Sequence, residues 1–250
     1  MQVGFGPIPV TSIISRQLEH YIVTHYLYPA LEDSPIDLSF ADQFAFRPTG
    51  STTAAIIAIL NTIADMLITN DHVIVVSLDF SRAFDSVKHI TLFEKIAKLK
   101  IQDNVYNWLR SYFQGRAHCT KFRREVSCVR PISASVVQGS GLGPATYSIA
   151  ASDLNPKNPE FKMHKFADDS YLITAGKFAN KIIDELEHVK VWANRNNLIL
   201  NCNKTRNYIL QKAFCQGHMS PPHGGNTEGE HHEDTWGGVS KQPEHGRTYQ

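Results

Sequence analysis

Two adjacent aspartates, Asp168 and Asp169, are the residues whose type and spacing point most directly to chemistry. They lie between the partly apolar run Met163–Phe166 and the strand-like run Tyr171–Thr174. The pattern predicts a β-hairpin with two carboxylates at its tip. Neighbouring like charges raise each other's pKa unless a cation offsets them, and a divalent metal ion is such a cation. The alternative is that both are ordinary turn residues, because Asp is common in hairpin turns.

A third aspartate, Asp79, directly follows the run Val73–Leu78. This run is too continuously apolar for a half-exposed strand and predicts a central strand of a sheet. A carboxylate at the end of a buried strand is costly unless it is paired or bound to a metal ion. Asp79 is therefore a candidate for the same site as Asp168.

Three further segments carry candidate binding residues. Arg47 lies in the Pro- and Gly-containing stretch Asp42–Thr53, where its guanidinium could bind a phosphate or pair with a surface carboxylate. Phe84 precedes a predicted helix and could simply fix that helix to the core. The segment Gln138–Pro144 has three glycines within five residues, which lets a backbone approach a ligand but also suits a plain helix start.

These residues require a scaffold of helices and short strands. Hydrophobic periodicity predicts helices over residues 11–31, 54–67, 86–99, 103–114, 144–154 and 179–194. Pro29 is expected to stop the first of them. Two short runs on either side of Arg123–Glu125 predict a hairpin with a basic tip over residues 118–129.

Length and composition favour a globular domain. The chain has 250 residues, of which 42% are hydrophobic, enough for one large domain or two small ones. No apolar run approaches the roughly 20 residues that span a bilayer, and residues 1–6 carry no positive charge to begin a signal peptide. The four cysteines have neither metal-ligand spacing nor the number needed for a disulfide scaffold. We expect an intracellular protein with reduced thiols.

Charge and composition change near residue 212. Residues 1–211 contain 22 Lys and Arg against 19 Asp and Glu, whereas residues 212–250 contain 3 against 5. A weakly basic body permits nucleic-acid binding without requiring it. Residues 212–250 hold 7 of the 15 glycines and 5 of the 12 histidines, and too few apolar residues to fold. We expect this tail to be disordered.

Three ordered motifs are similar to those of one known family. Leu78–Asp85, Gln138–Pro144 and Phe166–Asp169 resemble the catalytic motifs of reverse transcriptases from non-LTR (LINE-type, jockey-like) retrotransposons, and the resemblance covers residues 7–210. It implies an α+β fold, the fingers and palm of a right-hand polymerase with an antiparallel palm sheet backed by helices. Residues 1–70 would be fingers-like, residues 71–211 the palm with its inserts, and residues 212–250 a disordered tail such as a frameshift would produce.

The resemblance implies RNA-directed DNA polymerase activity. Two Mg²⁺ ions, replaceable by Mn²⁺, would stabilise the attacking 3′-oxygen and the leaving pyrophosphate, and the substrates and partners would be an RNA template, a DNA primer and dNTPs. The implied metal ligands are Asp79, Asp168 and Asp169. Lys204 matches a lysine proposed to protonate the pyrophosphate. The implied nucleotide-binding residues are Arg47 at the triphosphate, Phe84 as the wall that excludes a 2′-hydroxyl, and Phe80, Gln138 and Gly139.

The sequence also departs from the family pattern. Gly6 replaces a basic residue expected near the start, and the expected continuation into a thumb gives way to the Gly/His-rich tail, without a recognisable endonuclease. One alternative is therefore an inactive relic or domesticated fragment that folds as a palm and at most binds nucleic acid. Another is a viral-type RNA polymerase, which would not be expected to place an aromatic residue at position 84. Nucleus and cytoplasm are both compatible with a retrotransposon protein.

Overall fold

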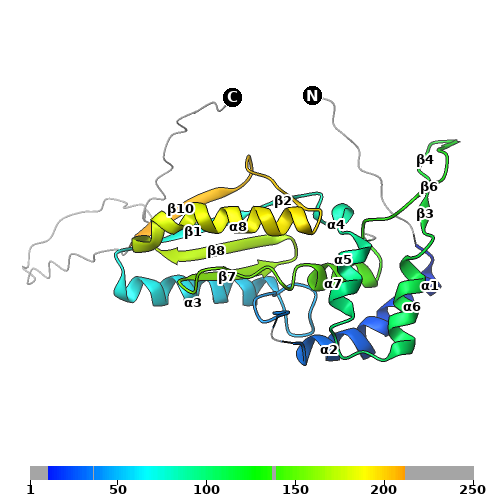
Figure 1. The fold of residues 1–250 in the computed structure, drawn as a ribbon, viewed down its shortest axis with the longest axis horizontal. Coiled ribbons are helices and arrows are strands. Elements are labelled where there is room, and N and C mark those ends of the chain that lie inside the picture. The colour runs from blue at the N-terminus through cyan, green and yellow to red at the C-terminus, as the bar shows by residue number, and fades with distance from the viewer. Residues whose placement is uncertain (1–10, 36, 137–138, 212–250) are drawn as a thin grey trace, which may run out of the picture.

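The computed structural model describes residues 11–35, 37–136 and 139–211. Its centre is a four-stranded antiparallel sheet in the order β10 (Arg206–Gln211), β1 (His72–Leu78), β8 (Asp169–Ala175) and β7 (Phe161–Phe166) (Figure 1). Helices cover this sheet and extend beyond one end of it. The predicted α+β class is confirmed, whereas the predicted tail lies outside the described residues.

The sheet register brings distant parts of the chain to one edge. β1 pairs with β8 so that Leu78 lies opposite Ser170, and β7 pairs with β8 so that Phe166 lies opposite Asp169. The predicted central strand and the predicted acidic hairpin are both present. Because β1 runs between β8 and β10, its end at Leu78 lies beside the tip of the β7–β8 hairpin.

Helices pack on both faces of the sheet. Val73 and Val75 face α3 (Thr52–Thr69), where Ile63 belongs to the same cluster. Ile74 and Val76 face the other way, into the main core that includes Val189 of α8 (Ile182–Arg195). This alternation follows from the two-residue period of a strand and explains the continuous apolar run of β1.

Helix α3 is long and apolar enough, by length and composition alone, to cross a membrane. It runs along the sheet and contacts β7, β8 and β1 (Figure 1). Its outer face exposes Ile57, Leu60 and Ile68.

The first predicted helix continues past Pro29. The segment consists of α1 (Ile13–Ile22), the π-helical turn η1 (Val23–Leu27) and α2 (Tyr28–Glu32). The prediction that Pro29 stops the helix is wrong, because Pro29 lies in the first turn of α2, where its missing N–H needs no partner within the helix.

The remaining elements complete the described part of the fold. They are β2 (Phe80–Ser81) paired with β9 (Ile199–Leu200), α4 (Ala83–Ser86), α5 (His89–Ile96), α6 (Asp103–Phe113), α7 (Leu142–Ala150) and the 3₁₀ segment η2 (Gly176–Lys181). One buried cluster extends from Ile22 to Leu198 and so crosses the predicted boundary at residue 70. The division into fingers and palm stays a prediction.

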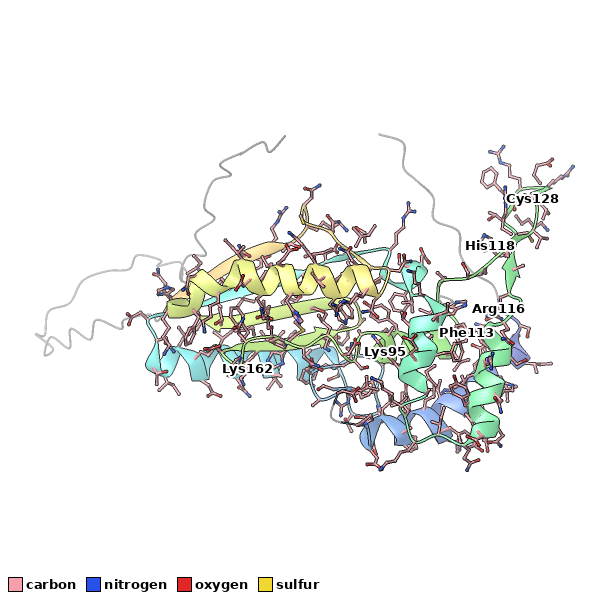
Figure 2. The ribbon with its side chains drawn as sticks, in the orientation of Figure 1. Lys95, Phe113, Arg116, His118, Cys128 and Lys162 are labelled. Carbon is pink, nitrogen blue, oxygen red and sulfur yellow. The ribbon has the colours of Figure 1, made fainter. Side chains whose placement is uncertain are left out.

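A basic ribbon, residues 117–131, projects from the body (Figure 1). It consists of the short strand pairs β3 (Ala117–His118) with β6 (Arg130–Pro131) and β4 (Lys121–Phe122) with β5 (Glu125–Val126). Every residue in it is exposed, including two free cysteines, and Figure 2 labels His118 and Cys128 there. This is the hairpin with a basic tip that the sequence predicts.

Candidate active site

The acidic residues converge at one end of the sheet. Asp79 follows the last residue of β1, Asp169 begins β8, and Asp168 lies in the turn between β7 and β8. Since Leu78 lies opposite Ser170, the register places Asp79 next to Asp169. The structure therefore brings together three carboxylates that are up to 90 residues apart in the sequence.

These carboxylates repel one another. The pKa of Asp169 is raised by burial and by the charges of Asp168 and Asp79, and Lys204 partly offsets the rise. Burial and the charges of Asp168 and Asp169 likewise raise the pKa of Tyr147, a fully buried residue of α7. Negative charge is therefore concentrated at this end of the sheet, and the nearby Lys204 partly balances it.

Asp79 has a carboxylate oxygen whose hydrogen-bonding capacity is not satisfied in the structure. Its Oδ2 is buried and has no hydrogen-bond partner, while its Oδ1 lies 3.7 Å from Nζ of Lys204. A buried carboxylate oxygen in this state is costly, and a hard divalent cation would satisfy it. The donor set of aspartate oxygens therefore fits Mg²⁺ or Mn²⁺.

Among the described residues, no three His, Cys, Asp or Glu side chains form a complete metal-binding cluster. Mg²⁺ usually takes only one or two protein carboxylates together with water and substrate phosphates. One or two of the carboxylates at this end of the sheet would therefore be enough protein ligands for such an ion. The assignment of Asp79, Asp168 and Asp169 as metal ligands stays a prediction.

Lys204 comes to the site from the segment between β9 and β10. The amide of Asn201 donates to the carbonyl of Asp79 at 2.8 Å, which ties this segment to the end of β1. The amide of Lys204 in turn donates to the carbonyl of Asn201 at 3.1 Å. The backbone of this segment thereby holds Lys204 near Asp79, with its side chain mostly exposed.

Phe84 lies beside the acidic site through Tyr147. The two rings stack with centroids 4.6 Å apart, and Phe46 meets Phe84 edge-on at 6.2 Å. The Phe84 ring is only partly buried and packs against the main core. This position is compatible with both predicted roles of Phe84, contact with the sugar of a nucleotide and attachment of its helix to the core.

The other predicted nucleotide-binding residues differ in their surroundings. The Phe80 side chain is buried against Trp192, with ring centroids 5.8 Å apart, so its predicted contact with a nucleotide can hold only for its main chain. Gly139 has a φ of 77°, which favours glycine, and open space beside its Cα. Gln138 lies outside the described residues.

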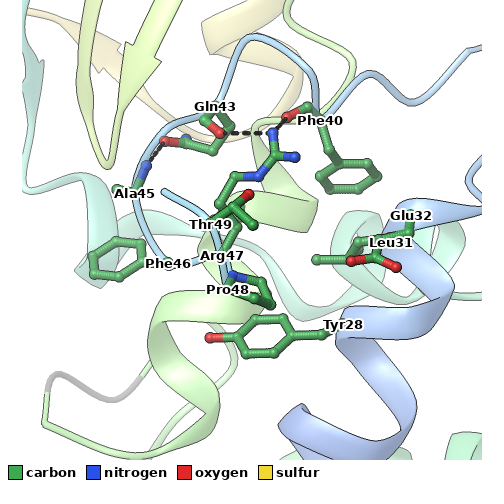
Figure 3. A pocket seen from close by; sticks show the side chains of 11 residues that line it. Tyr28, Leu31, Glu32, Phe40, Gln43, Ala45, Phe46, Arg47, Pro48 and Thr49 are labelled. Carbon is green, nitrogen blue, oxygen red and sulfur yellow. Dashed lines mark hydrogen bonds between the residues drawn. The ribbon is translucent and has the colours of Figure 1, made fainter. Parts of the chain in front are cut away.

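Arg47 lies in the loop of residues 40–50 (Figure 3). Its Nη1 donates to the carbonyl oxygens of Phe40 at 2.8 Å and Gln43 at 3.3 Å. The loop closes tightly, because a Cβ at Gly50 would lie 2.0 Å from the carbonyl oxygen of Phe44. Arg47 thus holds its own loop, and its predicted contact with a triphosphate stays a prediction for its remaining N–H groups.

Two residues that support the site were not singled out from the sequence. Gln43 forms hydrogen bonds with the main chain of Ala167, immediately before Asp168. Glu19, fully buried on α1, accepts from the amides of Gly141 at 2.7 Å and Leu142 at 3.4 Å, where α7 begins. Neither has a distinguishing signal in the sequence, because Gln43 follows Asp42 and Glu19 lies in a largely polar stretch beside His20, as surface residues do.

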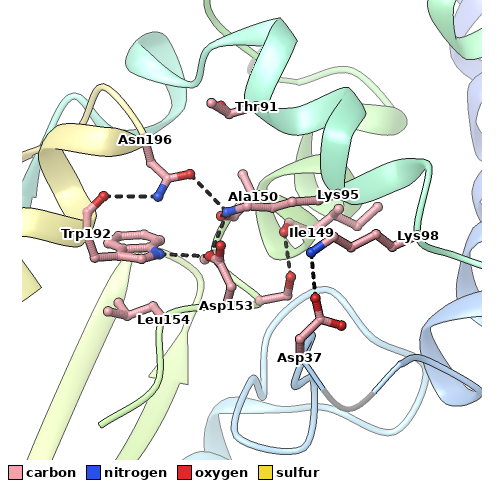
Figure 4. A network of polar contacts seen from close by, with 12 residues as sticks. Asp37, Thr91, Lys95, Lys98, Ile149, Ala150, Asp153, Leu154, Trp192 and Asn196 are labelled. Atoms are coloured by element: carbon pink, nitrogen blue, oxygen red, sulfur yellow. Dashed lines mark hydrogen bonds and ion pairs between the residues drawn. The ribbon is translucent and has the colours of Figure 1, made fainter. Parts of the chain in front are cut away.

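Two buried lysines hold the other end of α7. Nζ of Lys95 donates to the carbonyl of Ala150, to Asp153 and to Asn196 (Figure 4). Nζ of Lys165 donates to the carbonyls of Ala151 and Leu154 and pairs with Asp42 at 2.9 Å. A positive charge at a helix C-terminus is favourable, so α7 is fixed at both ends.

Solved structures share this fold. The telomerase of Candida tropicalis in complex with a fragment of telomeric RNA aligns with a TM-score of 0.57 at 15% identity, over 78% of this chain and 33% of the telomerase chain. The apo telomerase of the same organism aligns with a TM-score of 0.56 at 15% identity, over 80% of this chain and 41% of that chain. The likeness at this identity concerns the fold alone.

Sequence relatives are polymerases of mobile elements. The RNA-directed DNA polymerase from mobile element jockey of Drosophila melanogaster is 28% identical over 188 residues, 70% of this chain and 20% of that protein. The probable RNA-directed DNA polymerase from transposon BS of the same organism is 30% identical over 217 residues, 82% of this chain and 23% of that protein. The chain thus spans about a fifth of the length of these relatives.

The family comparison covers nearly the whole chain. Residues 5–236 match the family described as reverse transcriptase (RNA-dependent DNA polymerase). The match extends past residue 210, where the resemblance was expected to end. The chain therefore belongs to the reverse transcriptase family, as a domain similar to those of jockey-like non-LTR retrotransposons.

Proposed function

We propose that this chain is the polymerase domain of a retrotransposon reverse transcriptase, which adds dNTPs to the 3′-hydroxyl of a DNA primer on an RNA template. The observation that carries the proposal is the meeting of Asp79, Asp168 and Asp169 at one end of an antiparallel sheet, with Asp79 Oδ2 buried and unpartnered. Membership of the family supports it.

The proposal includes the right-hand arrangement of fingers and palm. The sheet with α3 and α8 would form the palm, and the likeness of the fold to telomerase supports this proposal. This division would move α3 out of the fingers-like part that the sequence predicts over residues 1–70. The helices beyond the acidic end of the sheet, α1, α2, α5 and α6, with the loop of residues 40–50, correspond to the fingers.

The acidic site would hold two divalent ions, which, when bound, stabilise the attacking oxygen and the leaving pyrophosphate. Asp79 and Asp169 would supply oxygen ligands from adjacent strand ends, and Asp168 would supply a third from the turn. The exposed ammonium of Lys204, 3.7 Å from Asp79, would deliver a proton to the leaving pyrophosphate.

The incoming nucleotide would lie between the acidic end and α7. The partly buried ring of Phe84 would face its deoxyribose, and the stacked Tyr147 keeps that ring in place. The open space at Gly139 would admit the nucleotide, and the unpaired N–H groups of Arg47 would bind its triphosphate.

The primer and template would be held mainly through their phosphates. The basic ribbon carries Lys121, Arg123, Arg124 and Arg130 against a single Glu125, all exposed to solvent. Such a surface attracts nucleic acid of any sequence, with an affinity that falls as salt is added.

A primer-extension assay tests the proposal. The full chain is mixed with an RNA template, an annealed DNA primer, dNTPs and Mg²⁺, and the matched control is Asp169→Asn, which keeps the size of the side chain but removes its charge. We expect extension by the wild type that is lost in the variant. Binding of primer-template without extension would instead favour a fragment that only binds nucleic acid, and preferential use of rNTPs would favour an RNA polymerase.

The choice of sugar tests Phe84 separately. Phe84→Val opens space where the ring stood, so incorporation of rNTPs should rise at least tenfold relative to dNTPs, which corresponds to more than about 1.4 kcal/mol of discrimination lost. The ratio of the two incorporation rates in primer extension measures it, with Phe178→Val as control, at a half-buried position in η2 beyond the other end of β8. Unchanged discrimination would make Phe84 a helix anchor only.

A further inference from the structure

The turn that carries Asp168 has a conformation that its own sequence disfavours. Phe166 and Asp169 pair across the hairpin, which leaves Ala167 and Asp168 as a two-residue turn. Ala167 has a φ of 58°, in the left-handed region, where the Cβ of an alanine is crowded. Glycine usually takes such a position in hairpin turns. Something outside the hairpin must therefore stabilise this turn.

Gln43 contacts both main-chain groups of Ala167. Its Oε1 accepts from the Ala167 amide at 3.0 Å, and its Nε2 donates to the Ala167 carbonyl at 3.2 Å. Gln43 is only 3% exposed, so these bonds are shielded from water. A single primary amide thus satisfies the donor and the acceptor of the one residue in the turn with a positive φ.

Gln43 is itself held rigidly. The amide of Phe44 donates to the carbonyl of Lys165 at 2.8 Å, and the amide of Lys165 donates to the carbonyl of Asp42 at 2.7 Å, so the loop pairs with β7 in parallel. The amide of Ala45 donates to Oε1 of Gln43 at 3.0 Å. The pairing with β7 therefore fixes the main chain around Gln43, and the bond from Ala45 fixes its side-chain amide.

Arg47 closes the same loop from its far end. Its Nη1 binds the carbonyl oxygens of Gln43 and Phe40, as Figure 3 shows. A chain of short contacts thus runs from Arg47 through Gln43 to Ala167, and the next residues are the carboxylates of the site.

We propose that Gln43 is a positioning residue that holds the Ala167–Asp168 turn in its left-handed conformation and thereby aims Asp168 and Asp169 at the metal site. Gln43 does not touch substrate or metal in this role. The consequence for metal binding depends on the proposed function, whereas the conformational role does not.

Amide exchange of the wild-type protein tests the conformational role. The amide of the first residue in a two-residue hairpin turn normally faces solvent and exchanges quickly. If Gln43 binds it, the Ala167 amide should exchange at least tenfold more slowly than an unprotected amide, as measured by NMR. Exchange at the unprotected rate would overturn the proposal without any variant having to fold.

Replacement of Gln43 tests the role in metal binding. Gln43→Leu removes both bonds with little change in volume, and we expect Mn²⁺ binding, measured by calorimetry, to weaken about tenfold. The matched control is Gln17→Leu, at an exposed position of α1, which should bind Mn²⁺ as the wild type does.

A glycine at position 167 separates positioning from general stability. Glycine adopts the left-handed conformation without cost, so Ala167→Gly in the Gln43→Leu background should restore Mn²⁺ affinity to within about threefold of wild type. A Gln43 that merely ties the loop to β7 would give no rescue, which would refute the proposal.

The two failures can be told apart. Absence of Mn²⁺ binding by the wild type would count against the proposed metal site, and the exchange rate of the Ala167 amide would still decide the role of Gln43. Normal Mn²⁺ binding by Gln43→Leu together with a protected Ala167 amide would also overturn the inference, because the turn would then not need Gln43 to present its carboxylates.

Discussion

The acidic end of the sheet and the basic ribbon both concentrate charge, but in opposite surroundings. The loop and helices around the acidic end contain buried charged side chains with named partners, as Lys165 has in Asp42 and Glu19 has at the start of α7. At the acidic end itself, Asp169 is exposed, but one carboxylate oxygen of Asp79 is buried without a partner. In residues 117–131 every charged side chain is exposed. Buried, paired charges hold the structure of the first region in place, whereas the exposed charges of the ribbon are accessible to a charged ligand.

The difference lies in the cost of removing a charge from water. A buried charge is expensive unless its partners are correctly placed, so its presence constrains the structure around it. An exposed charge is screened within about 8–10 Å at physiological salt and contributes little to stability. We therefore expect substitutions at the acidic end to affect metal binding or folding, and substitutions in the ribbon to affect only the attraction of nucleic acid.

Removal of a carboxylate should have the largest effect. Asp79→Asn should weaken Mn²⁺ binding at least 100-fold in calorimetry, because a strand-end ligand with a buried oxygen is lost. Glu125→Gln, at an exposed position of the ribbon, is the matched control and should leave binding unchanged. Equal Mn²⁺ affinity of Asp79→Asn and wild type would show that the site is assigned wrongly.

Removal of a buried cation should destabilise the fold. Lys165→Met leaves Asp42 buried without its partner and frees the carbonyls of Ala151 and Leu154, so the free energy of unfolding should fall by about 3–5 kcal/mol. Urea denaturation measures this loss. Lys121→Met, in the ribbon, should change stability by less than about 0.5 kcal/mol. Similar losses for the two variants would contradict the contrast between the regions.

Removal of charge from the ribbon should weaken nucleic-acid binding without affecting the fold. For the double variant Lys121→Gln and Arg124→Gln, we expect roughly tenfold weaker binding to a primer-template at 0.1 M salt and a slope of log affinity against log salt that is shallower by about 2. Fluorescence anisotropy measures both quantities. An unchanged salt slope would mean that the ribbon does not contact phosphates.

The smallest effect concerns one histidine. His164 of β7 is half-buried and faces α3, with Nε2 2.8 Å from Oγ1 of Thr62, and burial lowers its pKa. Because the folded state binds a proton at His164 less readily than the unfolded state does, its contribution to stability is full above about pH 6.5 and is lost as the pH drops through the lowered pKa. His164→Phe should therefore reduce the loss of stability in acid.

The denaturation midpoints of the wild type and of His164→Phe between pH 5 and 7 are the measurement. An unchanged slope of stability against pH in the variant would show that burial of His164 is not the cause.

The sequence determined the elements that depend on local patterns. The apolar run before Asp79 could only be a central strand, and the Asp168–Asp169 pair between two strand-like runs could only lie at a hairpin tip, so the family and the acidic site followed from short segments. The basic ribbon was predicted for the same reason, since its charges and its turn are adjacent in the chain.

Only the tertiary structure decided which buried polar residues support the site. Gln43 is 124 residues from Ala167, and Glu19 is 122 residues from Gly141, so no local pattern connects them. The burial of Phe80 against Trp192 and the extension of the first helix through Pro29 likewise depend on packing around them. Local periodicity reports which face of an element is apolar, but a hydrogen bond between distant segments exists only once the sheet register has brought them together.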